Sequence, residues 1–576
     1  MMHLDLQPPA GTRFESEWRD FDRLLYRWAL AIGATPALAR CAARLGLAES
    51  QGHTALPLDE VALDACREST LVGDGRVPTP FVLDGEGRFY FWRGHADECA
   101  VAAALTERCQ PAPTPLADGG ALAIEALFAA TDRTRTRAQQ QAVQAALRER
   151  LVVLTGAPGT GKTTTVLRML LALQRRAPAP LTIRLAAPTG KAAQRLQQAI
   201  ERGRRELAAQ LDGSWSGALA TLADVSAQTL HRLLEFDPRH GRWRRDREQP
   251  LAADVVVIDE ASMLDLAQMR ALLAALPGTT RLILVGDADQ LASVAAGAVL
   301  TDVVQALAEA GAPSLVRLDT VFRATPGLSV GNAAIRSGDI AALRSACGGG
   351  GIEQVAVHHP RELRRLLLEW ADQLAALLDA RDVHAGHDAE RAAATLQALQ
   401  QRQLLCALRE SAQGVLAVNA LLQAQLAPRF AQDAGPWFPG RIVMVTRNDE
   451  AHGLFNGDVG VALPDCDGRL LVWFEGRGDE PARAFVPALL PAHEPAFAIT
   501  IHKSQGSEYE RVAVLLAATP SSPILSRQLL YTAASRARQA LSLWASDEVL
   551  AAALARPVER SGGLQTKLRE ALGKRS

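Results

Sequence analysis

Residues 151–171, LVVLTGAPGTGKTTTVLRMLL, decide the fold of this chain. An apolar run is followed by the pattern G-x-x-x-x-G-K-[ST] and then by apolar residues at helical spacing. A strand, a glycine-rich loop and a helix in this order form a P-loop, in which backbone N–H groups cradle phosphates. The sequence therefore predicts a nucleotide-binding α/β domain built around this loop.

The loop supplies the candidate phosphate ligands. Its glycines let the backbone amides turn inward, Lys162 would reach the β- and γ-phosphates, and Thr163 would hold Mg²⁺. Gln139, upstream in QQQAV, could contact the adenine edge, although a glutamine-rich helix face explains its position equally well. The residues predicted to bind the nucleotide are Gln139, Gly156, Ala157, Pro158, Gly159, Thr160, Gly161, Lys162, Thr163 and Thr164.

Later apolar runs repeat the pattern and end in polar loops: TIRLAAPTG (182–190), VVVIDEAS (255–262) and LILVGDADQ (282–290). Such runs are typical of a parallel sheet covered on both faces, which places its chemistry at the carboxyl ends of the strands. Asp259 is predicted to hold Mg²⁺, and Glu260 to accept a proton from the attacking water. Gln290 could contact the γ-phosphate or the attacking water, or it could simply be capped by Asp287 or Asp289.

The second half of the chain continues the α/β pattern with one interruption. Residues 363–427 are rich in Ala, Leu and Gln and are predicted to be helical. Residues 441–496 carry short strands that we expect to form a small antiparallel, barrel-like insertion. The α/β pattern resumes at FAITIHKSQG (497–506). The predicted fold class is α/β, with two P-loop-type domains, a small β insertion and a mainly helical N-terminal domain.

The predicted domain boundaries follow these changes of pattern. CQPAPTPLADGG (109–120) concentrates Pro and Gly and is the best linker candidate. The expected units are an N-terminal domain (1–115), a first α/β domain (121–324) with a hairpin at 236–251, a second α/β domain (325–440 and 497–555), the β insertion (441–496) and a tail (556–576).

Composition limits the class of protein. The chain has 576 residues, is 48% hydrophobic and 22% charged, and has a formal net charge of −1, so any nucleic acid would have to bind in a local groove. We find neither a secretory signal nor an apolar run long enough to span a bilayer, which favours a cytoplasmic location. The 7 cysteines include no CxxC pair, and we expect buried thiols rather than a metal cluster.

Loops outside the P-loop could contact a nucleic-acid backbone. Hydroxyl, histidine and lysine side chains follow apolar runs in APTGKAA, QTLHRLL and TIHKSQGSEYE, and such side chains suit phosphate contacts without base reading. LLYTAASRAR is expected to place Arg536 and Arg538 on a helix. The DNA-contact candidates are Pro188, Thr189, Lys191, Thr229, His231, Thr500, His502 and Lys503, with Asn456 in LFNGD, for which a turn is the simpler account.

Taken in order, QQQAV, GAPGTGKT, APTGKAA, TLHRLL, VVIDEASM, LVGDADQL, VFR, ITIHKSQGSEY and YTAASRAR resemble the motifs of superfamily 1 helicases of the 5′-to-3′ branch. RNDEAHGLFNGDVGVAL and the terminal RPVERSGGL are similar to the RecD family, the α subunits of exodeoxyribonuclease V (RecBCD). The resemblance covers residues 138–545. Stand-alone helicases of this branch have a longer N-terminal extension, so a RecBCD subunit is expected and a stand-alone helicase is the alternative.

The resemblance implies an ATP-dependent 5′-to-3′ DNA helicase that uses ATP and Mg²⁺ and moves along the 5′-ended single strand of a duplex end. It implies RecB and RecC as partners in a heterotrimer, docking through the N-terminal domain, with the nuclease in the β subunit. Such a complex processes double-strand breaks for recombinational repair and degrades linear DNA. An inactive nucleotide-binding scaffold is disfavoured, because every catalytic residue type is present.

The resemblance also suggests roles for particular residues. Arg323 and Arg536 match the family arginines that reach the γ-phosphate, and a surface ion pair is the bland alternative for each. The hairpin at 236–251 matches a strand-separating pin, in which Trp243 could stack on DNA, although a solvated charged loop explains it about as well. The insertion at 441–496 resembles an SH3-like module.

Overall fold

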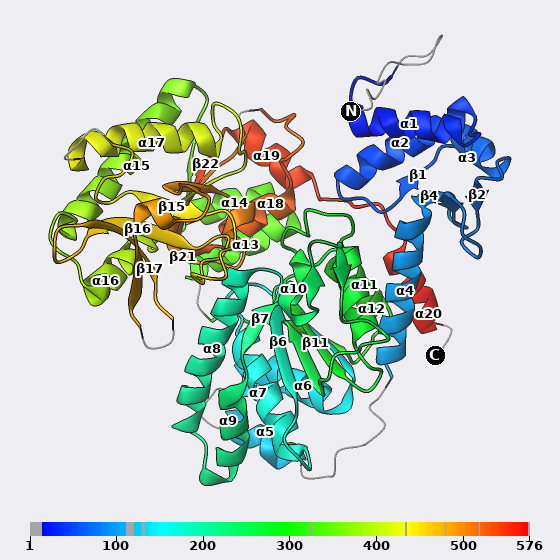
Figure 1. Cartoon of the computed structure of the whole chain (residues 1–576), viewed down its shortest axis with the longest axis horizontal. Helices are drawn as coiled ribbons and strands as arrows, with labels where there is room; N and C mark the ends of the chain where they lie inside the picture. Colours follow the sequence, from blue (N-terminus) through cyan, green and yellow to red (C-terminus); the bar gives the residue numbers. More distant parts are fainter. Residues whose placement is uncertain are drawn as a thin grey trace.

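The computed structural model describes residues 14–110, 120–128, 133–322, 325–431, 435–477, 480–517 and 519–573. Arg323, one of the predicted arginine fingers, lies outside these ranges. One α/β unit occupies the lower centre of Figure 1, a second lies at the upper left, and the N-terminal residues lie at the upper right. The predicted α/β fold class is confirmed.

The first α/β domain is built on a six-stranded parallel sheet in the order β12-β5-β11-β10-β6-β7. Its strands are β5 (Leu151–Gly156), β6 (Ile183–Ala187), β7 (Ala227–Thr229), β10 (Val255–Ile258), β11 (Arg281–Gly286) and β12 (Leu315–Leu318). Val152 and Leu154 join one apolar cluster, whereas Leu151 and Val153 join another. Both faces of the sheet are therefore buried, which is why its strands are apolar throughout.

Helices cover the two faces of this sheet (Figure 1). One apolar cluster includes residues of α5 (Gly120–Phe128), α6 (Arg133–Arg148), α7 (Lys162–Arg176), α8 (Gly190–Ala208) and α9 (Ser216–Thr221). The other includes α10 (Leu230–Leu233), α11 (Leu266–Ala275) and α12 (Val299–Glu309), together with helices from both ends of the chain, α4 (Trp92–Arg108) and α20 (Leu564–Gly573).

The second α/β domain has a five-stranded parallel sheet in the order β13-β22-β21-β14-β20. Its strands are β13 (Ile352–Val355), β14 (Arg402–Cys406), β20 (Ala498–Thr500), β21 (Tyr509–Leu515) and β22 (Ala537–Trp544). Its helices are α13 (Pro326–Ser337), α14 (Ile340–Cys347), α15 (Pro360–Ala380), α16 (Ala389–Leu399), α17 (Val415–Phe430), α18 (Arg527–Ala534) and α19 (Asp547–Ala555).

Two local predictions in this domain were wrong. Residues 363–427 are not helical throughout, because β14 lies between α16 and α17 and pairs with β20 and β21. Its sequence RQLLC has no β-branched residue, so only the tertiary pairing distinguishes it from a helical turn. Arg536 and Arg538 do not lie on a helix: α18 ends at Ala534, and Arg538 belongs to β22, whose pairing with β21 straightens the chain.

The insertion is a five-stranded antiparallel sheet in the order β18-β17-β16-β15-β19. It comprises β15 (Ile442–Val445), β16 (Val459–Pro464), β17 (Leu470–Glu475), β18 (Ala482–Phe485) and β19 (His493–Pro495). The antiparallel insertion is thus confirmed, and its SH3-like character stays a prediction. The hairpin also forms, since β8 (Phe236–Asp237) pairs with β9 (Arg242–Trp243), while its role as a pin stays a prediction.

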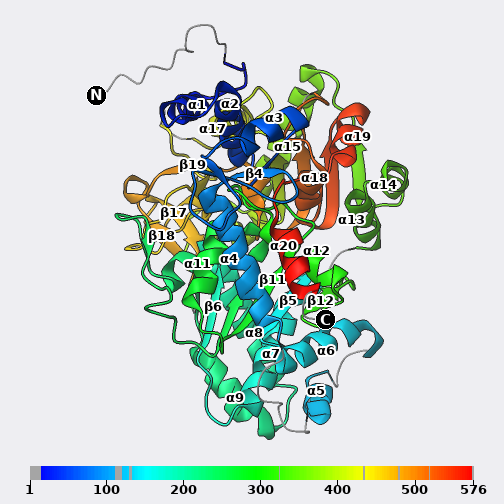
Figure 2. The ribbon, with the colours of Figure 1, turned by 90° about the vertical axis from the view of Figure 1, so that its right-hand side faces the viewer.

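The N-terminal residues form a small α/β unit with its own core. Helices α1 (Asp20–Ala31), α2 (Pro36–Ser50) and α3 (Glu60–Arg67) pack with β1 (Leu56–Pro57), β2 (Val72–Gly73), β3 (Phe81–Leu83) and β4 (Arg88–Phe91). Strands β3 and β4 pair antiparallel as a hairpin. Figure 2 shows α4 descending from this unit along the first α/β domain, with α20 beside it. Within the described ranges, no helix has the length and apolarity to cross a membrane.

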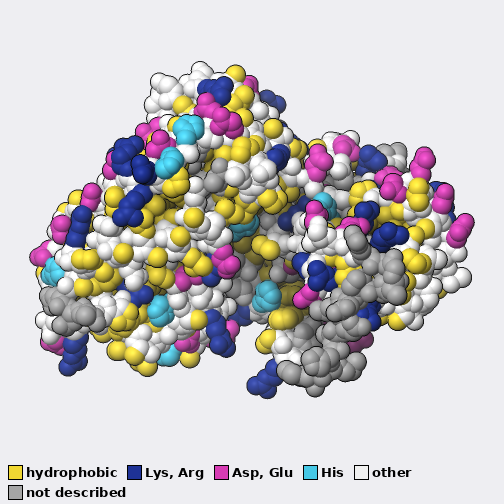
Figure 3. All heavy atoms as spheres, turned by 90° about the horizontal axis from the view of Figure 1, so that it is seen from above, with side chains coloured by type: hydrophobic (Ala, Val, Ile, Leu, Met, Phe, Trp, Pro, Cys, Tyr) yellow, Lys and Arg dark blue, Asp and Glu magenta, His cyan; other side chains and the backbone are white. Residues whose placement is uncertain are grey.

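Charge is mixed over the face shown in Figure 3, where basic and acidic side chains are interspersed and no single-sign field covers the surface. This pattern agrees with the net charge of −1. Long-range steering of a polyanion by this face is therefore weak, and any phosphate contacts must be made locally.

Candidate functional site

A cleft of about 340 Å³ lies between the two α/β domains. The first domain lines it with the P-loop, with the carboxylates that follow β10 and with Gln290. The second domain adds residues that follow β20 and α18. The predicted residues that line this cleft are Pro158, Gly159, Gly161, Lys162, Thr163, Thr164, Asp259, Glu260, Gln290 and Arg536, together with Gly506 and Arg538.

The P-loop has the backbone geometry that its glycines predict. Gly159 and Gly161 have φ values of 79° and 81°, in the left-handed region that favours glycine. The ammonium of Lys162 donates to the carbonyl oxygens of Gly156 (2.7 Å) and Ala157 (3.1 Å). The lysine is thus held against the loop, within reach of phosphates bound there.

Gln139 lies behind the P-loop rather than along the cleft. Its Nε2 donates to the Thr160 carbonyl oxygen (3.2 Å), and its Oε1 accepts from Nη1 of Arg168 (3.1 Å). A Cβ on Gly161, where φ is 81°, would lie 2.7 Å from Gln139 Nε2, so a side chain there would strain the backbone and displace Gln139. Gln139 therefore braces the loop, and its contact with adenine stays a prediction.

The two carboxylates after β10 suit a cation. Asp259 Oδ1 accepts a hydrogen bond from the Glu260 backbone N–H (2.9 Å). Burial and the negative charge of Glu260 raise the pKa of Asp259 to about 6, against the opposing effect of Lys162. Glu260 adopts φ = 51°, a left-handed backbone conformation that costs a non-glycine residue on the order of 1 kcal/mol. The Glu260 side chain therefore projects from a strained turn.

Arg536 is 2% exposed and is held entirely by the second domain. Its Nε donates to the Thr532 carbonyl oxygen (2.9 Å) and its Nη1 to the Ser507 carbonyl oxygen (3.1 Å). Arg538, in contrast, donates to the carboxylate of Glu508 at 2.9 and 2.6 Å. Arg538 therefore forms a surface ion pair, whereas Arg536, for which that alternative was considered, forms no ion pair with the described residues.

Gln290 is 4% exposed and is bonded to Asp287, one of the two capping partners that the sequence offered, while its contact with phosphate or water stays a prediction. Its Nε2 donates to Asp287 Oδ2 (3.0 Å), while its Oε1 is buried and has no hydrogen-bond partner among the described residues. A buried acceptor without a donor is costly unless a ligand or water supplies one. In a cleft that also contains Lys162, this acceptor could orient a water molecule.

The segment around Gln290 also joins the two domains. The Tyr531 hydroxyl donates to Asp287 Oδ2 (3.0 Å), and the Leu291 backbone N–H donates to Thr532 Oγ1 (2.8 Å). Gln505 Nε2 donates to the Leu291 carbonyl oxygen (3.1 Å). Residues 287–291 therefore contact both the cleft and the second domain. The sequence had offered Tyr531 and Thr532 only as part of a motif, without a role.

The candidate DNA-contact threonines share one local geometry. Thr189 lies two residues after β6, and Thr229 and Thr500 are the last residues of β7 and β20. The hydroxyl oxygens accept backbone N–H groups three residues later, at 3.2, 3.2 and 3.3 Å respectively. Each hydroxyl therefore caps the turn at the carboxyl end of a strand, which is the place predicted for phosphate contacts. Pro188 precedes the first of these threonines.

The other DNA-contact candidates occupy different environments. Lys191 is covered by the insertion loop that contains Asn456, and its burial beside Arg195 lowers the pKa of Lys191 to about 8. Lys503 forms an ion pair with Glu494. His231 packs 5.0 Å from Trp243, so the hairpin aromatic ring contacts protein here. Burial and the positive charge of Arg560 lower the pKa of His502.

Phe322 is a residue that the sequence analysis missed. Its backbone N–H donates to the Gly159 carbonyl oxygen (2.9 Å), its ring is 39% exposed, and the guanidinium of Arg135 lies 5.2 Å from the ring centroid. An exposed ring beside a P-loop offers a stacking surface for a base. The signal was its place in VFR, immediately before Arg323.

Two family models and several known proteins are similar to this chain. Residues 139–296 match the AAA domain family, and residues 495–544 match the UvrD-like helicase C-terminal domain. The RecBCD enzyme subunit RecD of Mycobacterium tuberculosis is 38% identical over 95% of this chain and 91% of its own length. The RecD subunit of Haemophilus influenzae is 33% identical over 75% of this chain and 72% of its own.

A more distant relative is the ATP-dependent RecD2 DNA helicase of Deinococcus radiodurans, and a solved structure of Bacteroides Pif1 bound to single-stranded DNA is also similar. The first is 31% identical over 82% of this chain but only 55% of its own length. The second is 19% identical, with a TM-score of 0.36, over 71% of this chain and 92% of its own.

Two parallel-sheet domains with a P-loop cleft between them define the class of this protein as a two-domain P-loop nucleotide-binding protein. Within that class, the identity to M. tuberculosis RecD extends over nearly the whole chain. The chain belongs to the RecD family.

Proposed function

We propose that this protein is an ATP-dependent DNA helicase, the motor subunit that works with RecB and RecC on double-strand DNA ends. The observation that carries the proposal is the cleft in which Lys162, Asp259 and Glu260 of one domain meet Arg536 of the other. A site divided between two domains closes when nucleotide binds and opens after hydrolysis, which moves the domains against each other.

The chemistry of the cleft is divided among its side chains. Lys162 would contact the terminal phosphates, Glu260 would accept a proton from the attacking water, and Gln290 would orient that water. Arg536 would stabilise the charge that develops on the transferred phosphoryl group. Thr163 and Asp259 fit Mg²⁺, since the raised pKa of Asp259 marks a carboxylate that a cation would stabilise. Bound Mg²⁺ would neutralise phosphate charge.

The DNA strand is proposed to cross the strand ends of both domains. The contacts would come from Pro188, Thr189, Lys191, Thr229, His231, Asn456, Thr500, His502 and Lys503. The same proposal includes the 5′-to-3′ direction of movement, the domain boundaries, the cytoplasmic location and the role of Arg323. The near-complete match to a protein named as a RecBCD subunit supports the heterotrimer over the stand-alone alternative.

The first test is Lys162→Gln. We expect this variant to lower the rate of DNA-stimulated ATP hydrolysis at least about 100-fold, because the ammonium that would stabilise the negative charge of the transferring phosphates is removed. Duplexes with a 5′ or a 3′ single-stranded tail test the direction, and co-purification with RecB and RecC tests the assembly. Undiminished hydrolysis by Lys162→Gln would refute the motor proposal.

A further inference from the structure

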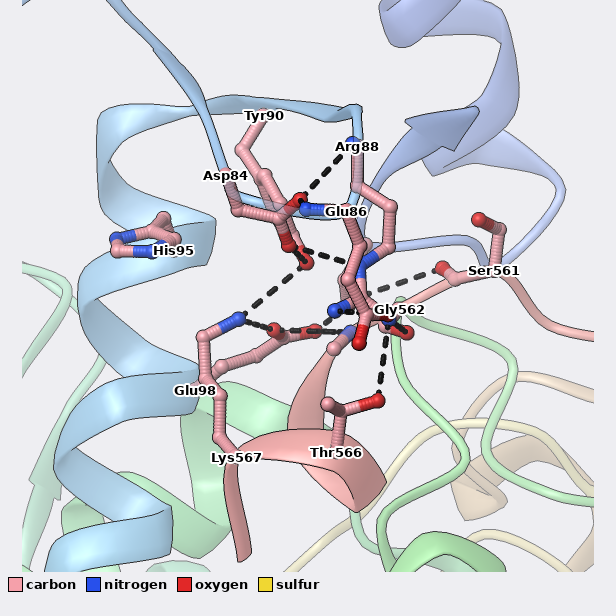
Figure 4. Close-up of polar contacts among 12 residues, drawn as sticks. Asp84, Glu86, Arg88, Tyr90, His95, Glu98, Ser561, Gly562, Thr566 and Lys567 are labelled. Carbon is pink, nitrogen blue, oxygen red and sulfur yellow. Dashed lines mark hydrogen bonds and ion pairs between the residues drawn. The ribbon is translucent and has the colours of Figure 1, made fainter. Parts of the chain in front are cut away.

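The end of the chain returns to the N-terminal unit and holds it against the first α/β domain. We call residues 559–567 the C-terminal strap. Glu98 of α4 is 1% exposed, and its carboxylate accepts from the Gly563 backbone N–H (3.0 Å) and pairs with Lys567 (2.8 Å). Arg88 Nη1 donates to the Gly562 carbonyl oxygen (3.2 Å). Figure 4 shows these contacts meeting on one side of α4.

The backbone of the strap is also bound to the N-terminal unit. The Ser561 carbonyl oxygen accepts from the backbone N–H groups of Thr54 (2.9 Å) and Ala55 (3.2 Å). The Ser561 N–H donates to His53 Nδ1 (2.9 Å). Burial and the neighbouring Arg560 lower the pKa of His53, which keeps this nitrogen available as an acceptor. The strap position is therefore determined by the N-terminal unit.

From this position the strap extends one side chain into the first α/β domain. Arg560 Nη1 donates to the carbonyl oxygens of Ala295 (2.9 Å) and Gly297 (2.8 Å), and its Nη2 donates to that of Ser293. A single guanidinium thus binds three carbonyl groups of one loop, residues 293–297. The Gly297 N–H donates in turn to the Gly52 carbonyl oxygen (2.9 Å), so the N-terminal unit contacts the same loop directly.

The loop that Arg560 holds begins next to the nucleotide cleft. Ser293 is only two residues beyond Leu291, whose backbone N–H and carbonyl oxygen are bound by Thr532 and Gln505 of the second domain. Gln290, immediately before it, lines the cleft. One short segment is therefore tied at one end to the second α/β domain and at the other end to Arg560.

We propose that Arg560 is a positioning residue for ATP hydrolysis: by holding residues 293–297 it sets the position of Gln290 in the cleft, and it makes that position depend on where the N-terminal unit sits. The inference rests on the proposed ATPase function. Arg560 suits the role because a planar guanidinium with five N–H groups can bind several carbonyl oxygens in one fixed geometry, which a lysine cannot do.

The test uses the full-length chain with saturating single-stranded DNA. Arg560→Gln is expected to lower kcat for ATP hydrolysis by about ten-fold or more while KM for ATP changes less than about two-fold, because the water-orienting group is misplaced and the phosphate-binding loop is intact. Arg560→Lys, which keeps the charge, should recover part of kcat. The matched control is Arg569→Gln, which removes an exposed arginine of α20 that pairs with Glu309 at 3.7 Å, and its kcat should be unchanged.

A second variant, Gly52→Ala, disturbs the contact of Arg560 with residues 293–297 without changing Arg560. A Cβ on Gly52, where φ is 91°, would lie 2.6 Å from Arg560 Cζ, so Gly52→Ala should displace the guanidinium and lower kcat with Arg560 still present. Combination with Gln290→Ala then separates positioning from general stability. If Arg560 acts through Gln290, Arg560→Gln should lower kcat no further in a Gln290→Ala background.

These outcomes separate the inference from the function on which it rests. The positioning role would be overturned if Arg560→Gln kept the wild-type kcat, or if it lowered kcat equally in the wild-type and Gln290→Ala backgrounds. Either result would leave the proposed motor function intact. A wild-type chain without DNA-stimulated hydrolysis would instead overturn the proposed function. Should Arg560→Gln fail to fold, Arg560→Lys and Gly52→Ala decide the question by the same kcat measurement.

Discussion

At the scale of single residues, the cleft distinguishes two neighbouring arginines that the sequence alone presents as equals. Arg538 is neutralised by Glu508, whereas Arg536 donates to carbonyl and hydroxyl oxygens and has no carboxylate partner in the part of the chain that the structure describes. An unpaired buried guanidinium is unfavourable in the resting protein. Its retention beside a P-loop is explained if a phosphate supplies the missing negative charge during the reaction.

The resulting prediction compares Arg536→Gln with Arg538→Gln. We expect Arg536→Gln to lower kcat for ATP hydrolysis about 1,000-fold, since an arginine finger contributes effects of this size. Binding of a fluorescent ATP analogue should change far less, because the P-loop is untouched. Arg538→Gln is the control and should lower kcat less than about ten-fold. Equal losses in the two variants would contradict the distinction drawn here.

At the scale of elements, local sequence was informative wherever a residue pattern repeats. The P-loop strand and the strands ending at Asp259 and Gln290 were predictable, because a strand buried on both faces must be apolar throughout. β14 was missed, since five residues without β-branching carry no local signal and become a strand only by pairing with β20 and β21. The C-terminal strap was missed for a similar reason: its contacts lie about 500 residues away in sequence.

The residues of the candidate site were predictable from the sequence to about the same extent as the helices and strands. Residues tied to a motif, such as Lys162 and Asp259, could be placed because phosphate chemistry demands a fixed spacing. The contacts around each candidate side chain could not be predicted from the sequence. Burial of Lys191 under the insertion and the bracing of the P-loop by Gln139 both depend on contacts that form only after folding.

One element, α12, carries a charge that makes stability depend on pH. Burial and the negative charge of Glu98 raise the pKa of Asp302 on α12 to about 7, against the opposing charge of Arg560. In the unfolded chain an aspartate titrates near about 4, so between these values the folded state binds more protons than the unfolded state. Stability should therefore fall as pH rises from about 4 to 7.

Asp302→Asn tests this sign. At pH 5 the folded wild-type side chain is protonated, and this pH is only about one unit above the pKa of the unfolded aspartate, so the variant should melt only slightly above the wild type. At pH 8 the variant should melt at a higher temperature than the wild type, because it buries no unpaired charge. Asp372→Asn, which removes the exposed partner of Arg429, is the control and should show no such trend. A melting-temperature difference that is the same at both pH values would refute the prediction.

At the scale of the whole molecule, three bodies meet around residues 287–297. The second α/β domain reaches this segment through Tyr531, Thr532 and Gln505, and the N-terminal unit reaches it through Gly52 and the C-terminal strap. The segment itself leads into the cleft at Gln290. Domain movement and nucleotide chemistry are therefore connected through the hydrogen bonds of this segment and the packing of Leu291 in the second domain, so single side chains should influence the coupling.

Tyr531→Phe should uncouple the two domains. It removes the second-domain hydroxyl that donates to Asp287 Oδ2 (3.0 Å) of the first domain, and a hydrogen bond to a carboxylate contributes about 1.5–3 kcal/mol. The catalytic groups stay in place, so ATP hydrolysis should fall about two- to three-fold while duplex unwinding falls about ten-fold or more. The ratio of ATP hydrolysed to base pairs unwound, measured in one assay, should therefore rise.

The matched control for this coupling is Ser214→Ala, which also removes a hydroxyl that donates to an aspartate, from Ser214 to Asp212, inside the first α/β domain. It should leave the ratio of ATP hydrolysed to base pairs unwound unchanged, because that bond lies within one body. If Tyr531→Phe lowered hydrolysis and unwinding equally, the bond would serve the chemical step alone. The transmission of domain closure would then have to rest on Thr532 and Gln505, the remaining donors and acceptors that reach Leu291.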